Sequence, residues 1–115
     1  MIKQIVSRHM ELDKDLKATI IRLINKIPQY GLDITRIHVI LEDVNGPNKG
    51  GIDMRCHLSV RGPQKLDIEI EEIDENCWQA VSLAFQRLNQ VLSRIHLQRR
   101  NLRATPLMLV EQSLP

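Results

Sequence analysis

The chain has 115 residues, of which 43% are hydrophobic and 26% are charged, and its formal net charge is only +2. These values predict one soluble globular domain rather than a polybasic tail. Aromatic residues make up only 3%, which argues against binding single-stranded nucleic acid by stacking along several aromatic side chains. Two cysteines are too few for a disulfide framework, and the sequence shows no secretory signal and no apolar run of the roughly 18 residues that a membrane span needs. We therefore expect a cytoplasmic protein with reduced thiols.

The first part of the chain predicts a strand, a helix and a second strand. Residues 2–6 are a short β-rich run, and residues 36–44 return to strand character. Asp13 is a plausible N-cap for the helix between them, and Pro28 with Gly31 marks its end. Apolar residues recur at helical spacing in this helix: Leu16, Ile20, Leu23, Ile24 and Ile27.

The rest of the chain predicts two more strands and a long helix. Residues 52–61 alternate between apolar and polar, and residues 65–71 alternate again after a turn, so both are half-buried antiparallel strands. Asn76 is a plausible N-cap for the last helix. The apolar stripe of that helix comprises Cys77, Val81, Ala84, Phe85, Leu88, Val91, Leu92 and Ile95.

The element order β-α-β-β-β-α predicts an α+β fold. A right-handed crossover through the first helix makes the first two strands parallel, and two antiparallel hairpins complete a four-stranded mixed sheet. Burial of every apolar face is simplest if both helices cover one face of the sheet, which gives a two-layer sandwich like a double-stranded-RNA-binding domain. We expect this domain to span residues 1–104 and residues 105–115 to form a C-terminal tail, whose apolar run at 107–110 could dock a protein partner.

Charge is unevenly distributed along the second half of the chain. Residues 67–75 contain six acids and no base: Asp67, Glu69, Glu71, Glu72, Asp74 and Glu75. Residues 86–103 contain five arginines and no carboxylate: Arg87, Arg94, Arg99, Arg100 and Arg103. Such polarity predicts one face that attracts polyanions and another that repels them. The plain alternative is that the cations favour the helix dipole and the acids protect an edge strand.

Two segments carry a family resemblance. "IVSRHMELDKDLKATI" has a strand, a short turn, an acid and a helix with an early leucine, through Arg8, His9, Glu11 and Leu16. "ENCWQAVSLAFQRLNQVL" has a last-helix pattern formed by Trp78, Ala80, Val81, Arg87 and Leu88. Together with the element order, over roughly residues 2–100, these segments resemble the hibernation-promoting factor and ribosome-associated inhibitor family. Ser7 and Ser82 depart from the pattern, because the family has a glycine and an acid at these places.

The resemblance implies a protein without enzymatic activity that binds the small ribosomal subunit in stationary phase and blocks the channel for messenger and transfer RNA. The basic side chains of the first helix fall away from its apolar stripe, and Arg87 and Arg94 lie at the edge of the stripe of the last helix. Helices side by side therefore predict one basic layer that attracts phosphates. The candidate RNA-binding residues are Arg8, Lys14, Lys17, Arg22, Lys26, Arg87, Arg94, Arg99 and Arg100. The alternative is a protein-interaction module on the same scaffold that has lost ribosome binding. We expect no cofactor, no small-molecule substrate and no membrane partner.

The histidines raise the question of a metal site. If Leu41 pairs with Met54, His38 lies opposite His57, and the next hairpin could place Glu69 across from His57 and Glu71 across from Arg55. Two histidines and a glutamate can bind zinc. Exposed cross-strand pairs more commonly add modest stability to the sheet, so we predict no metal.

The cysteines do not predict catalysis. Cys56 points inward from the middle of a strand, where a thiol behaves as a small apolar group. Cys77 begins a helix, where the dipole could lower its pKa, but its place on the apolar stripe favours packing in the core. The sequence contains no Gly-rich phosphate loop followed by a helix and no Ser-His-Asp order.

Overall fold

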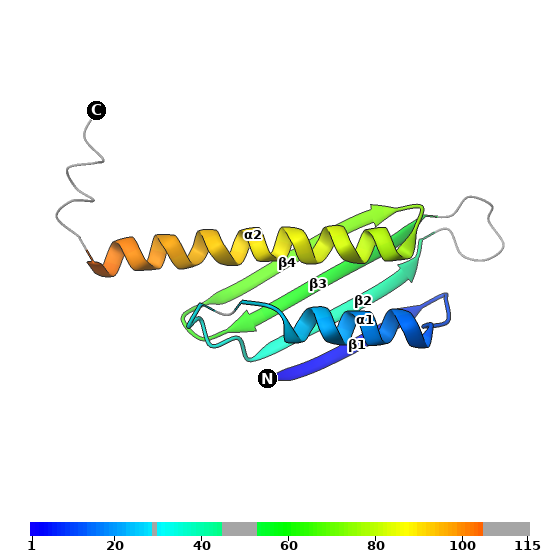
Figure 1. The fold of residues 1–115 in the computed structure, drawn as a ribbon, viewed down its shortest axis with the longest axis horizontal. Helices are drawn as coiled ribbons and strands as arrows, with labels where there is room; N and C mark the ends of the chain where they lie inside the picture. The colour runs from blue at the N-terminus through cyan, green and yellow to red at the C-terminus, as the bar shows by residue number, and fades with distance from the viewer. Residues whose placement is uncertain (29, 45–52, 105–115) are drawn as a thin grey trace, which may run out of the picture.

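The structure is a computed structural model, and it describes residues 1–28, 30–44 and 53–104. The chain forms, in order, β1 (Ile2–Arg8), α1 (Lys14–Asn25), β2 (Arg36–Asp43), β3 (Met54–Gly62), β4 (Leu66–Asp74) and α2 (Cys77–Ala104). The predicted order β-α-β-β-β-α is confirmed (Figure 1).

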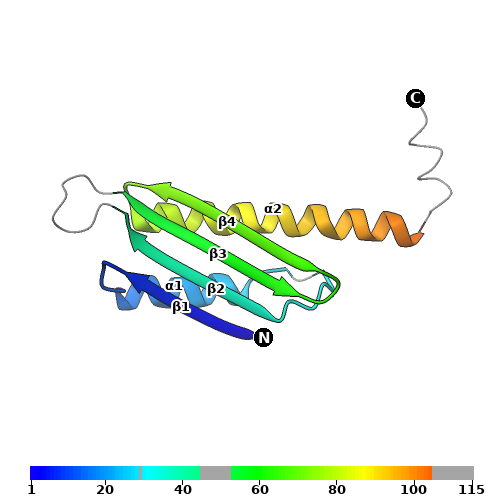
Figure 2. The same ribbon diagram turned by 180° about the vertical axis from the view of Figure 1, so that it is seen from behind.

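The four strands form one sheet in the order β1-β2-β3-β4, with β1 parallel to β2 and the other two pairs antiparallel. Both helices cover the same face of this sheet, as the front and back views show (Figures 1 and 2). The helix α2 packs on β3 and β4, and α1 lies along β1 and β2. The predicted two-layer α+β sandwich is therefore confirmed, and no described helix covers the second face of the sheet. We call this second face the open face and the other side the helix face.

The core lies between the two layers, where the strand alternation and the helical stripes meet. Ile37, Val39 and Leu41 of β2 are fully buried, as their alternation predicts. The other strands and both helices add Leu58, Val60, Leu66, Ile68, Ile70, Leu16, Ile20, Ile24, Val81, Phe85, Leu88 and Leu92. Among the described residues, no polar or charged residue is buried in this core. Charge is thus confined to the surfaces of the sandwich.

Both predicted helix caps are present. The Asp13 carboxylate accepts a hydrogen bond from the backbone N–H of Asp15 at 3.2 Å, and α1 begins at the next residue, Lys14. The Asn76 side-chain oxygen accepts from the backbone N–H of Trp78 at 2.8 Å. Each cap satisfies an N–H that has no partner within its helix.

The predicted strand register is wrong by two residues. Leu41 pairs with Cys56, so His38 lies opposite Ser59 and His57 opposite Ile40. In the next hairpin His57 pairs with Glu71 and not with Glu69. A shift of two residues keeps every side chain on its own face, so the alternation that predicts the faces cannot fix the register.

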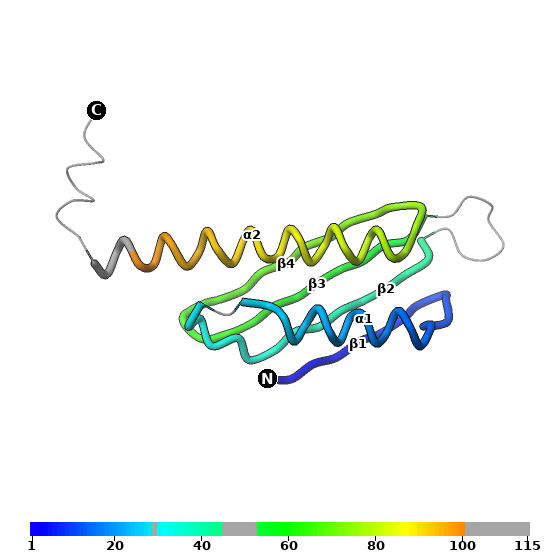
Figure 3. The backbone as a smooth tube through the Cα atoms, viewed as in Figure 1, coloured from blue at the N-terminus to red at the C-terminus, as the bar shows by residue number. Residues whose placement is uncertain are grey.

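The helix α2 is longer than the sheet beneath it. Its 28 residues span about 42 Å, whereas the nine residues of β4 span roughly 30 Å. Its C-terminal turns extend past the ends of the strands, beyond the loop that precedes β2 and the turn between β3 and β4 (Figures 1 and 3). Within the described residues, neither helix combines the length and the apolarity needed to cross a bilayer.

Candidate nucleic-acid interface

Arginine 55 of β3 is the centre of a charge network on the open face. Its guanidinium donates to Glu42 of β2 at 3.0 Å and to Glu71 of β4 at 2.8 Å. Burial alone would lower the pKa of Arg55, but the hydrogen bonds and charges of the two carboxylates outweigh it and raise that pKa. The positive charge of Arg55 is therefore compensated by the carboxylates of Glu42 and Glu71 within the sheet.

A second cluster on the open face surrounds Glu69 of β4. Its carboxylate accepts from His57 Nε2 at 2.7 Å, from the Ser59 hydroxyl at 3.0 Å and from Arg61 at 3.0 Å. Burial would raise the pKa of Glu69, but these hydrogen bonds and the neighbouring charges lower it. Arg61 also bonds Asp67 at 3.2 Å, so both arginines of β3 are paired with two carboxylates each.

The predicted contacts of His57 with Glu69 and of Arg55 with Glu71 form, although the strands pair in a different register from the predicted one. His57 reaches Glu69 and Arg55 reaches Glu71 diagonally, because each acid lies two residues along β4 from the direct partner. Arg55 Nη2 also lies 3.3 Å from His57 Nδ1. Because a guanidinium only donates, Nδ1 accepts, and the imidazole proton lies on Nε2 and faces Glu69.

The arrangement of His38 and His57 on which a zinc site depends does not form. His38 is opposite Ser59, and its Nε2 atom is buried without a hydrogen-bond partner. Within residues 1–28, 30–44 and 53–104, no three histidine, cysteine or acidic side chains gather as metal ligands.

The cations of α1 are in a different state from those of the open face. Lys14, Lys17 and Lys26 are exposed, and no hydrogen bond or ion pair joins their side chains to the described part of the chain. Arg22 donates only to the neutral Thr19 hydroxyl at 3.2 Å. The structure therefore groups four of the predicted residues on one helix with their charges uncompensated.

Arg8 is separated from this group. It ends β1 in register with Glu42, a residue of the open face. The fold therefore does not bring Arg8 together with the helix cations.

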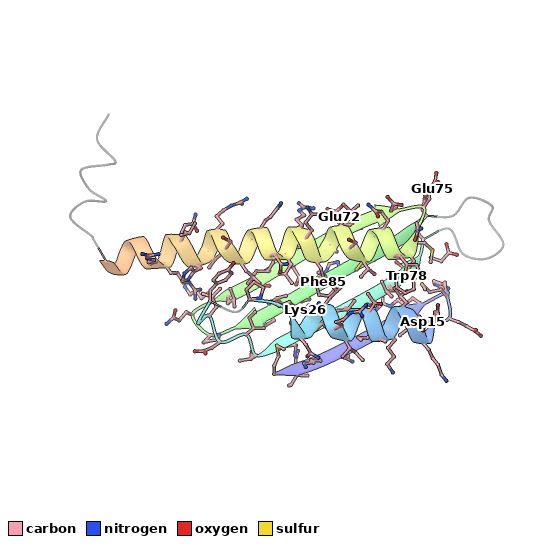
Figure 4. The ribbon with its side chains drawn as sticks, viewed as in Figure 1. Asp15, Lys26, Glu72, Glu75, Trp78 and Phe85 are labelled. Atoms are coloured by element: carbon pink, nitrogen blue, oxygen red, sulfur yellow. The ribbon has the colours of Figure 1, made fainter. Side chains whose placement is uncertain are left out.

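Arg87 and Arg94 lie on the flank of α2 that faces away from α1. Arg87 donates to the Glu72 carboxylate at 3.1 Å and to the Glu71 carbonyl oxygen at 3.4 Å, and β4 is the edge of the sheet beneath that flank. Figure 4 shows Glu72 and Phe85 on opposite sides of α2, with Phe85 toward α1. Arg94 follows Arg87 by about two helical turns and shares its flank, but it is exposed and has no partner among the described residues.

Arg99 and Arg100 lie at the overhanging end of α2. Arg99 donates to the side-chain oxygen of Gln64 at 3.3 Å and to its carbonyl oxygen at 3.1 Å. Both acceptors are neutral, so these bonds orient the Arg99 guanidinium without compensating its charge. Arg100 is exposed and unpaired within the described residues. No local sequence pattern marks Gln64, because the contact joins residues 35 positions apart.

The cysteine predictions are confirmed as core packing. Burial, together with the charges of Cys77 and Glu72, raises the pKa of Cys56 to about 12. Burial also raises the pKa of Cys77, which is packed against the core.

The predicted protein-docking run at residues 107–110, like the whole predicted tail at 105–115, lies outside the described residues.

The four-stranded mixed sheet with two helices on one face defines a class of small α+β domains that includes solved relatives. A ribosomal subunit interface protein from Coxiella burnetii superposes with a TM-score of 0.70 at 19% identity, covering 83% of this chain and 97% of that chain. The N-terminal domain of Thermus thermophilus Protein Y gives a TM-score of 0.67 at 20% identity, covering 82% and 97%. At these identities, the likeness establishes the fold alone. No curated protein matches the chain by sequence.

The family model described as Sigma 54 modulation protein / S30EA ribosomal protein matches residues 3–100. The chain belongs to this family, and the resemblance found in the sequence over roughly residues 2–100 is confirmed. The family description is that of a ribosomal protein and not of an enzyme.

Proposed function

We propose that this protein is a ribosome hibernation factor that binds the small ribosomal subunit through the helix face and has no enzymatic activity of its own. Membership of the S30EA ribosomal protein family supports this function, as does the fold shared with a ribosomal subunit interface protein. The proposal includes action in the cytoplasm of stressed or stationary-phase cells.

The observation that carries the proposal is the difference in pairing between the arginines of β3 on the open face and the cations of the helices. On the open face, Arg55 and Arg61 are each bonded to two carboxylates. On the helices, five exposed cations have no partner within the described residues: Lys14, Lys17, Lys26, Arg94 and Arg100. An unpaired cation can neutralise an RNA phosphate and release its counterions, whereas a paired one must first give up its carboxylate.

The proposed mechanism is occupancy. A rigid sandwich lays its helix face against ribosomal RNA, which proteins recognise largely through backbone phosphates and shape. While it is bound in the channel, messenger and transfer RNA cannot enter. The interface comprises Lys14, Lys17, Arg22, Lys26, Arg94, Arg99 and Arg100, with Arg87 available after its ion pair with Glu72 opens. Arg8, which is in register with Glu42 of the open face, is not part of it.

Charge reversal tests the interface. The double variant Lys17→Glu, Arg94→Glu removes one unpaired cation from each helix, and we expect it to lose co-sedimentation with purified small subunits at moderate salt. The matched control is Arg36→Glu, which reverses an exposed and unpaired arginine at the start of β2 on the open face. Equal binding by the double variant and the wild type would refute the helix face as the interface.

Occupancy of the channel needs a separate experiment. We expect the wild-type protein to compete with initiator transfer RNA for small subunits programmed with messenger RNA, and the double variant not to compete. Stable binding of the protein without displacement of transfer RNA would refute the channel while leaving ribosome binding intact.

A further inference from the structure

A pocket of about 540 Å³ lies beneath the overhanging end of α2. Its walls are residues 30–33 of the segment before β2, Pro63 and Gln64 of the turn between β3 and β4, and side chains of the last described turns of α2. A Cβ atom added at Gly62 would lie 3.2 Å from the Asp33 carbonyl oxygen, so the end of β3 and the segment before β2 approach closely next to the lining residues Asp33 and Pro63. The volume falls within the range of about 300–1,000 Å³ found for sites that enclose small ligands.

The pocket contains one aromatic platform. The ring of Tyr30 stacks on the imidazole of His96, with centroids 4.8 Å apart and ring planes 19° from parallel. Stacking on His96 uses one face of the Tyr30 ring, and the side chain is still 40% exposed. The exposed part of the Tyr30 side chain leaves room for contact with one planar group. The low aromatic content excludes a series of such platforms but not a single one.

The pocket also contains two arginines whose charges are not cancelled. The contacts of Arg99 with Gln64 leave three of the five N–H groups of its guanidinium for another acceptor. Arg100 lines the same pocket without a partner among the described residues. A guanidinium whose plane is already fixed is suited to bind a phosphate by donating parallel hydrogen bonds to it.

The backbone around the pocket adopts a conformation that side-chain-bearing residues rarely hold. Tyr30, Asp33 and Gln64 all line the pocket and have φ angles of 53°, 55° and 59°. Gln64 and Lys65 are the central residues of a turn closed by the Leu66 N–H and the Pro63 carbonyl oxygen at 3.2 Å. Turns of this kind prefer Asn-Gly. Strained residues that carry functional side chains cluster at ligand sites, and here the strain positions Tyr30 beside His96 and Gln64 beneath Arg99.

We propose that this pocket binds a nucleoside monophosphate, with its base on Tyr30 and its phosphate on Arg99 and Arg100. The Asp33 carboxylate favours a nucleotide over inorganic phosphate. Its carboxylate would repel inorganic phosphate, but it accepts hydrogen bonds from ribose hydroxyls or from an amino group of a base. The ligand has two sources, a free nucleotide or an unpaired nucleotide of an RNA chain. The inference goes beyond the proposed function, because it requires no ribosome.

Nuclear magnetic resonance of the full ¹⁵N-labelled chain tests the pocket. We expect adenosine 5′-monophosphate to shift the backbone amides of Gly31 and Gln64 saturably, and adenosine or inorganic phosphate to bind at least about tenfold more weakly. Tyr30→Leu and Arg99→Gln should each weaken binding about tenfold. The matched controls are Trp78→Leu, an exposed aromatic residue in the first turn of α2, and Arg36→Gln on the open face, and both should bind like the wild type.

A five-residue adenylate RNA distinguishes the two sources. Binding at the same amides, at least about tenfold tighter than the mononucleotide, assigns the pocket to an unpaired RNA nucleotide, and equal affinity assigns it to the free nucleotide. Two results would overturn the inference: no shift at the pocket with either ligand, or inorganic phosphate reproducing the whole effect. Because the unliganded spectrum reports folding of each variant, loss of binding is separated from loss of structure. Intact co-sedimentation with small subunits alongside a failed titration would remove the pocket and leave the proposed function standing.

Discussion

The two faces of the sandwich carry the same kinds of charged side chain, but both arginines of β3 on the open face are paired with carboxylates, whereas most described cations of the helices are not. On the open face, strand pairing places Glu42 and Glu71 on either side of Arg55, so acids and bases neutralise one another across neighbouring strands. On the helix face, residues 86–103 supply cations and no carboxylate. Among the described arginines of this segment, only Arg87 is in an ion pair. A net charge of +2 conceals this division. The comparison teaches that the pairing of charges, and not their number, marks the surface available to a polyanion.

Salt dependence should give the largest difference between the faces. With about five phosphate contacts, the affinity for small subunits should fall roughly 100- to 500-fold between 50 and 200 mM salt. Co-sedimentation at several salt concentrations measures the slope. Arg61→Gln, which removes a paired cation from the open face, should leave that slope unchanged. A salt-insensitive complex would break the comparison.

Removal of Arg55 should destabilise the fold without affecting the ribosome complex. In Arg55→Met, the Glu42 carboxylate, whose side chain is only 21% exposed, loses its cation. We expect a loss of about 1–3 kcal/mol in the free energy of unfolding, measured with urea. The matched change Arg94→Met should cost less than about 0.5 kcal/mol, because Arg94 supports no other described group. Equal losses in the two variants would contradict the assignment of stabilising charge to the open face.

Glu72→Gln sharpens the comparison within α2. The substitution frees Arg87 from its ion pair, which is 3.1 Å long and joins a 57% exposed Arg87 to a 27% exposed Glu72. Affinity for small subunits should rise about two- to fivefold, since the pair is worth at most about 1 kcal/mol. Glu75→Gln, at an exposed acid without an ion pair in the described chain, controls for the change in net charge. An equal rise in both variants would show that only net charge matters.

The smallest expected effect is the pH dependence of Glu69. Its folded-state pKa lies below the ordinary value of 4.5, so its interactions stabilise the fold above that value and are lost as the pH falls through the lowered pKa. At neutral pH, Glu69→Gln should be less stable than the wild type by under about 1 kcal/mol, because the carboxylate is partly exposed. Urea unfolding should show the difference shrinking from about pH 5 to about pH 3. A difference that is constant over this range would exclude the charge of Glu69 as the cause.

The fold was predictable because burial follows local periodicity. Alternation through Ile37, Val39 and Leu41 indicated the buried face of β2, and Asp13 and Asn76 indicated where the helices begin. Register was not predictable, because a slip of two residues preserves the same alternation.

The candidate site was predictable only in part. Sequence patterns identified the cations but not their partners, which depend on contacts between distant segments, as between Arg99 and Gln64. One signal was available for Arg87. Consecutive acids in a strand must point to opposite faces, so one of Glu71 and Glu72 had to face the helix layer.

The overhang of α2 has a mechanical consequence. Past the sheet, α2 has no strand beneath it. There it is held by the ring contact of His96 with Tyr30 and by the hydrogen bonds of Arg99 to Gln64. Its amides near these contacts should exchange with deuterium sooner than those between Val81 and Leu92, where strands support the helix from below. A ligand that binds Arg99 or Tyr30 therefore changes how strongly the end of α2 around His96 and Arg99 is held in place.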